Sequence, residues 1–226
     1  MFSTHDDPAK SKSKALFVVG PRCANVSPPS ALILNGKELP WVSRCDHLGH
    51  TLTIEGTMSQ DCVEKRAAFI DSAVKVKETF HFAHPIERIS AVQTYCTSFY
   101  DSNLWRLRSP EVEGIYASWR THVKLSWDLP RNCHNYFISH VLAPHVWSVK
   151  SSLLSKFHNF FLGLLCSDTH EVSVMARIAS RDIRSNFGSN VRLLHDETGL
   201  DPWVTTPMEM KCKLREMSIS EIPEGA

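Results

Sequence analysis

The hydrophobic period of the sequence changes near residues 55–59, and this change constrains the fold more than any other feature. Before it, apolar residues come in short runs separated by Gly, Pro and Asn, as at residues 15–19 and 31–34, which is typical of β-strands. After it, apolar residues recur at helical spacing. The sequence therefore predicts an α+β, predominantly helical fold, with a small antiparallel sheet at the N-terminus followed by a bundle of about six helices.

The boundaries of these regions follow from local signals. Asn35-Gly36 stands between an apolar run and the next apolar position, which predicts a hairpin whose turn needs two positive φ angles. We expect a sheet region at residues 1–58 and a helical region at residues 59–205. Residues 206–226 are rich in charge and end in Pro-Glu-Gly-Ala, which predicts a loose C-terminal tail.

Individual helices also have start and stop signals. Ser109-Pro110-Glu111 combines a capping residue, a proline and an acid, so it predicts a helix start. Residues 153–165 carry Leu and Phe along one face and predict the clearest helix of the chain. Another helix is expected at about residues 171–185, and Gly188 and Gly199 are expected to bracket a last short one.

Composition excludes several classes of protein. The 25 basic and 24 acidic side chains give a formal charge of +1, which excludes nucleic-acid binding by overall charge alone. No stretch has the 18 consecutive apolar residues of a membrane-spanning helix, and the first residues are polar where a secretory signal needs an apolar core. The seven cysteines are odd in number and widely spaced, which favours free thiols and an intracellular location, in the cytoplasm or nucleus.

The near-neutral total hides a local excess of positive charge. Residues 8–37 contain five cations and no acid. Three of the cations, Lys10, Lys12 and Lys14, alternate with small residues, so an extended backbone places their ammonium groups on one side. Such a row could bind phosphate. The other interpretation is a solvated segment that protects an edge strand from aggregation, which is the commoner role of such lysines.

Other candidate sites are weaker. Asp6-Asp7 resembles a pair of metal-binding carboxylates, but adjacent residues in a strand face opposite sides and no apolar strand precedes the pair. The groups at residues 45–50 and 133–145 combine Cys and His without the spacing of a zinc site, so ordinary histidines are the preferred interpretation. No nucleophile–base pattern, P-loop or dinucleotide glycine motif occurs, so we assign no catalytic residue and no metal ligand.

Six strings, taken in order along the chain, resemble one family. They look like the C-terminal part of a reverse transcriptase from a non-LTR (LINE-type) retrotransposon, over about residues 2–203. The strings are PAKSKSKALFVVG, LNGKELPWVSRCDHLGHTL, KRAAFID, VQTYCTSFYDSNLW, SWRTHVKLSWDLPRNCHNYF and ETGLDPW.

The resemblance implies roles for particular residues. Lys10, Lys12 and Lys14 match the family's lysine-bearing segment after the catalytic hairpin, and Leu48 and Gly49 match the strand that grips the primer end. The residues that flank this pair, His47 and His50, differ from the family's usual aromatic and aliphatic residues. The helices after residue 59 then correspond to the thumb and connecting region, which hold the template–primer duplex by its backbone.

The resemblance also implies that this segment lacks the magnesium-binding aspartates of the palm. The palm aspartates that hold magnesium would precede Met1, so no cofactor is assigned and the segment is expected to be inactive as a polymerase. The expected function is that of a truncated reverse-transcriptase relic that binds RNA or DNA template–primer without sequence preference. Two alternatives stay open: a helical protein-interaction module, and a transposon-derived product with no function. No membrane partner is expected, and the oligomeric state is open.

Overall fold

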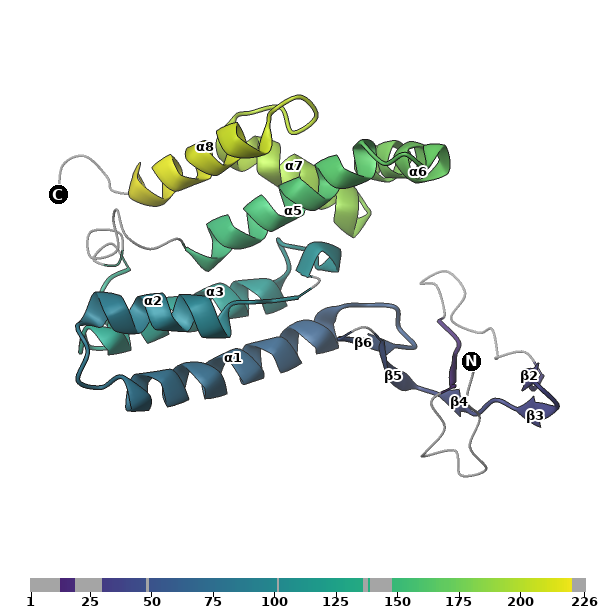
Figure 1. Ribbon diagram of the computed structural model, residues 1–226, viewed down its shortest axis with the longest axis horizontal. Coiled ribbons are helices and arrows are strands. Elements are labelled where there is room, and N and C mark those ends of the chain that lie inside the picture. The colour runs from purple at the N-terminus through teal and green to yellow at the C-terminus, as the bar shows by residue number, and fades with distance from the viewer. Residues whose placement is uncertain are drawn as a thin grey trace. The chain divides into compact units, whose positions relative to one another are not determined.

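A computed structural model describes residues 13–18, 30–47, 49–100, 102–135, 138 and 148–220 (Figure 1). The chain divides into two compact units, which we call the N-terminal unit, Met1–Asp61, and the helical unit, Cys62–Ala226. The N-terminal unit contains all the described strands, and helices dominate the rest. The expected fold class, a predominantly helical protein with a small N-terminal sheet region, is confirmed.

The strands of the N-terminal unit are short and pair two by two. They are β1 (Ala15–Leu16), β2 (Ile33–Leu34), β3 (Lys37–Glu38), β4 (Trp41–Val42), β5 (Arg44–His47) and β6 (His50–Thr53). The β2–β3 pair is the predicted hairpin: Asn35 and Gly36 both have positive φ, 52° and 76°. A turn with two positive φ angles matches the twist of an antiparallel pair, which explains why Asn-Gly marks it.

One pair differs from the expected antiparallel sheet. β1 pairs with β4 in parallel, with Ala15 opposite Trp41 and Leu16 opposite Val42, whereas β2–β3 and β5–β6 are antiparallel. The Ala15 N–H donates to the Pro40 carbonyl at 3.0 Å, and the ring of Phe17 packs edge-on against Trp41. A parallel pair needs a long crossover, and the chain between β1 and β4 is long enough to include the β2–β3 hairpin.

Seven α-helices lie within the described residues, and together they build the core of the helical unit. They are α1 (Ser59–Thr79), α2 (Pro85–Cys96), α3 (Pro110–Ser126), α5 (Val149–Leu165), α6 (His170–Arg181), α7 (Asn186–Thr198) and α8 (Pro207–Ser220), with the 3₁₀ turn η1 (Ser102–Leu104) before α3. Helix α5 is central, because it contacts α3, α6, α7 and α8 (Figure 1). Its apolar side chains Leu153, Leu154, Phe157 and Phe161 are fully buried, as the periodicity predicts.

The start of α3 agrees with its sequence signal. Ser109 is the N-cap, its Oγ accepts a hydrogen bond from the Val112 N–H at 3.3 Å, and Pro110 is the first helical residue. The serine thereby satisfies one of the amide groups that the first helical turn leaves without a partner.

We expect the substitution Ser109→Ala to lower the free energy of unfolding by about 1 kcal/mol, because the N-cap hydrogen bond is lost. Chemical denaturation followed by the helical circular dichroism signal measures this change. Ser90→Ala is the matched control, since Ser90 is exposed within α2, and it should have almost no effect. Equal losses in both variants would contradict the capping role.

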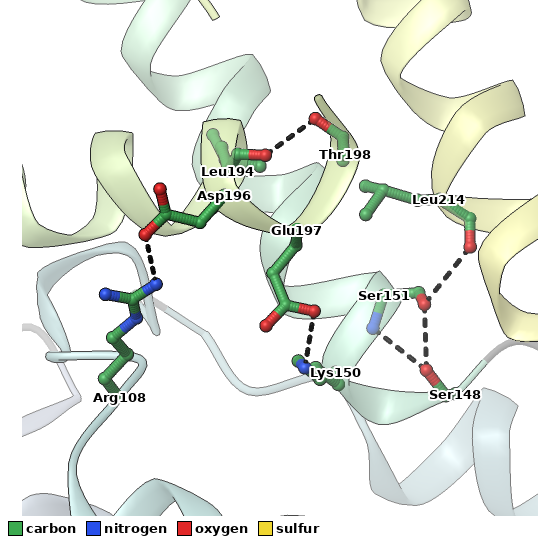
Figure 2. A network of polar contacts seen from close by, with 9 residues as sticks. All are labelled: Arg108, Ser148, Lys150, Ser151, Leu194, Asp196, Glu197, Thr198 and Leu214. Atoms are coloured by element: carbon green, nitrogen blue, oxygen red, sulfur yellow. Dashed lines mark hydrogen bonds and ion pairs between the residues drawn. The ribbon is translucent and has the colours of Figure 1, made fainter. Parts of the chain in front are cut away.

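The prediction of a loose tail from residue 206 is wrong for residues 207–220, which form helix α8. Thr206 and Glu209 cap α8 reciprocally: the Thr206 N–H donates to Glu209 Oε2 at 2.8 Å, and the Glu209 N–H donates to Thr206 Oγ1 at 3.3 Å. Met210 and Leu214 are fully buried, and Ser151 Oγ of α5 donates to the Leu214 carbonyl (Figure 2). Two buried residues at helical spacing are enough to dock a helix that is otherwise highly charged.

The boundary between α6 and α7 also differs from the prediction. α6 ends at Arg181, and Ser185 caps α7 by accepting a hydrogen bond from the Gly188 N–H at 2.9 Å. Gly188 thus lies in the first turn of α7 instead of preceding it, and a Cβ there would lie 2.3 Å from the Asp182 carbonyl oxygen. Glycine is required by this close approach. Gly199 ends α7 at φ 69°, as predicted.

Candidate nucleic-acid interface

Lys14 is the one lysine of the expected phosphate-binding row that lies within the described residues. It is exposed and comes directly before β1, whose pairing with β4 holds the backbone extended at this point. Lys10 and Lys12 lie outside the described residues. The side chain of Lys14 is thus exposed to solvent just before β1, where its ammonium group can reach a phosphate.

Gly49 lies in the turn between β5 and β6. The register places His47 opposite His50, and Gly49 has φ 83°, a conformation that favours glycine. Gly49 is exposed, so the backbone of this turn can approach a ligand closely. Leu48, its partner in the expected primer-gripping strand, lies outside the described residues.

The sequence analysis missed a buried polar cluster that anchors the β5–β6 hairpin. His50 Nδ1 lies 3.2 Å from Asp61 Oδ2, and the Thr51 N–H donates to Asp61 Oδ1 at 3.2 Å. All three residues are buried. Asp61 belongs to the first turn of α1, where a carboxylate is favoured by the helix dipole. The cluster therefore fixes the hairpin on the start of α1.

The structure does not bring Lys14 and Gly49 into one cluster. Lys14 lies beside Pro40, because the next residue, Ala15, bonds to the Pro40 carbonyl. Gly49 lies in the turn of the β5–β6 hairpin. The hydrogen bond from the Ile54 N–H to the Ser43 carbonyl closes the opposite, open end of this hairpin. The two expected binding positions are therefore separate points of the N-terminal unit.

The Cys/His groups do not assemble into a metal site in the described part of the chain. Within residues 13–18, 30–47, 49–100, 102–135, 138 and 148–220, no cluster of three His, Cys, Asp or Glu side chains could hold a metal ion. In the first group His50 is engaged by Asp61, and Cys45 lies opposite Leu52. In the second group His140 and His145 lie outside the described residues, as does the acidic pair at residues 6 and 7.

Several cations of the helical unit have structural partners. Arg108 Nη2 donates to Asp196 Oδ2 at 2.5 Å, and Lys150 Nζ donates to Glu197 Oε2 at 2.7 Å. These two contacts connect α7 to the segment before α3 and to α5 (Figure 2). Lys124 is buried and donates to the carbonyl groups of Arg131 and Cys133. These three cations help to hold the fold, so they are poor candidates for phosphate contact.

Comparison with known proteins identified no relative of this chain. The chain matches no model of a known protein family, and no curated protein or solved structure is significantly similar to it. None of the helices in the described ranges has both the length and the apolarity needed to cross a membrane.

Proposed function

We propose that this chain comprises the last part of the palm, followed by the thumb and connecting region, of a reverse transcriptase of the non-LTR retrotransposon type. We propose further that it binds a template–primer duplex through the sugar–phosphate backbone of the nucleic acid. The observation that carries the proposal is the order of elements. A strand preceded by lysine comes first, then a hairpin with Gly49 in its turn, and then helices alone from α1 onward. The resemblance implies the same order, with palm strands first and the helical thumb and connecting region after them.

The proposed binding is electrostatic and independent of sequence. Lys10, Lys12 and Lys14 neutralise phosphates, while the exposed turn at Leu48 and Gly49 approaches the primer strand. Phosphate contacts fix the position of a protein on a duplex but carry no sequence information. The proposal assigns binding and no catalytic step to this segment, and it places the protein inside the cell, where the six described cysteines stay free thiols.

The proposal predicts a salt-dependent affinity for an RNA–DNA primer–template. For three neutralised phosphates, we expect binding to weaken roughly 40-fold between about 50 and about 200 mM salt, because condensed counterions are released. Fluorescence anisotropy with a labelled duplex measures this. The variant Lys10→Ala, Lys12→Ala, Lys14→Ala should bind weakly and lose most of the salt dependence.

A triple alanine variant at Lys211, Lys213 and Arg215 is the matched control, since it removes the same charge from helix α8, which follows the residues that the resemblance assigns to the thumb and connecting region. It should bind as the unchanged chain does. Equal losses in both triple variants would mean that overall charge governs binding. An affinity that does not respond to salt, measured on protein with its full helical circular dichroism signal, would refute the proposal.

A second candidate function, a helical protein-interaction module, is favoured by one observation. Helix α6 exposes large apolar side chains, including Met175 and Ile178, that a surface helix ordinarily turns inward. A chain that self-associates but ignores added RNA and DNA would support this function over the first.

A further inference from the structure

Helix α6 is oriented with its small residues toward the protein and its large apolar residues toward solvent. Ala176 and Ser180 are buried, and Ser173 Oγ donates to the Leu165 carbonyl at 3.0 Å, so this side packs on the rest of the helical unit. On the other side Met175 is 63% exposed, Ile178 59% and Val174 36%. A surface helix normally shows the reverse arrangement.

This orientation is held firmly by the neighbours of α6. The helix contacts α5 and α7, and the turn that follows it packs against Gly188 so closely that a Cβ would collide with the Asp182 carbonyl. Small side chains on the inner side allow the close packing. The outward apolar side is therefore a fixed feature of the fold. We call the row formed by Val174, Met175 and Ile178 the α6 stripe.

Charged residues of opposite sign stand at the two ends of the α6 stripe. Glu171 lies at its N-terminal end and Arg181 at its C-terminal end, and both are exposed. Each is five residues from Ala176, while Val174 and Ile178 are each two residues from it. Neither Glu171 nor Arg181 has an ion pair to another residue in the part of the chain that the structure describes.

We propose that the α6 stripe is the interface of a homodimer with two-fold symmetry. A second copy of α6, laid antiparallel at the level of Ala176, places its Arg181 opposite Glu171 and its Ile178 opposite Val174. The same contacts recur on the other side of the axis, as an isologous interface requires. Parallel pairing would instead set like charges against each other. The inference stands independently of the proposed nucleic-acid binding.

The dimer should be weak. One helix against one helix buries less than the roughly 1,200 Å² of total surface that stable complexes reach, so a dissociation constant in the micromolar range is expected. Sedimentation equilibrium of the full chain between about 1 and about 100 μM should show a rising average mass. A monomer over this whole range overturns the proposal and leaves the α6 stripe to a different protein.

A pair of methionine variants tests the location of the interface. Met175→Glu places a charge within the stripe and should abolish association. Met208→Glu is the matched control, because Met208 is 69% exposed in the first turn of α8 and lies outside the stripe. The control should dimerise as the unchanged chain does. Association that survives Met175→Glu would overturn the proposal.

Charge reversal tests the antiparallel arrangement. Glu171→Arg alone, or Arg181→Glu alone, sets two pairs of like charges together and should weaken the dimer about tenfold. The double variant re-forms both opposite-charge pairs and should restore the affinity. Glu171 and Arg181 each interact favourably with the helix dipole at their own end of α6. If the single variants acted only by destabilising α6, the double variant would lose both interactions and would associate least. That result would overturn the proposal.

Discussion

Replacing Asn190 by alanine should lower the free energy of unfolding of the helical unit by about 3 kcal/mol. The side chain is fully buried in α7, and it joins this helix to the segment before α3. Its Oδ1 accepts from the Leu107 N–H at 2.9 Å, and its Nδ2 donates to the Trp105 carbonyl at 2.7 Å. The substitution leaves two backbone groups buried without these partners, and each such group costs about 1–3 kcal/mol.

Asn186→Ala is the matched control for this prediction. Asn186 begins the same helix but is exposed, so its loss should change the free energy of unfolding by less than about 0.5 kcal/mol. Denaturant unfolding followed by tryptophan fluorescence reports on the region directly, since Trp105 is one of the linked residues. A loss below about 1 kcal/mol for Asn190→Ala would show that water replaces the missing hydrogen bonds.

Features that depend on neighbouring residues could be predicted from the sequence. Asn35-Gly36 specifies its hairpin because the turn conformation is a property of those two residues, and Ser109-Pro110 specifies the start of α3 for the same reason. The α5 periodicity predicted its buried side correctly, because a helix with this many Leu and Phe side chains has only one way to hide them.

Features that depend on residues distant in the sequence could not be predicted. Nothing near His50 indicates that its partner is Asp61, and nothing near Asn190 indicates that it bridges Trp105 and Leu107. The periodicity of α6 shows that one side is apolar but not that this side faces outward, because inward packing of Ala176 and Ser180 depends on α5 and α7. In the candidate site, the sequence therefore indicated residue types near the turn but not the buried cluster that fixes it.

The helical unit should lose stability in mild acid because His122 is buried without a compensating partner. Its ring packs edge-on against Phe69, with centroids 6.4 Å apart, and no described residue forms a hydrogen bond with its Nε2. Burial, with repulsion from Lys77 as the smaller cause, lowers the pKa of His122 from 6.5 to about 4.

The direction of the effect follows from this shift. The folded state binds a proton at His122 less readily than the unfolded state does, so the stability is complete above about pH 6.5 and declines as the pH falls toward 4. At about pH 5 the loss from this group should be about 2 kcal/mol. His158 adds to it, because burial lowers its pKa as well, although the Pro202 carbonyl near its Nε2 partly opposes that shift.

His122→Leu tests this assignment because it removes the titrating group and keeps an apolar side chain of similar size beside Phe69. When the pH falls from about 7.5 to about 5, the free energy of unfolding of this variant should decrease by about 2 kcal/mol less than that of the unchanged chain. His81→Leu is the control, since His81 is exposed and should leave the pH dependence unchanged. If His122→Leu and the unchanged chain lost the same stability in acid, the imidazole of His122 would have to be solvated in the folded protein, and its packing against Phe69 would not be the source of acid sensitivity.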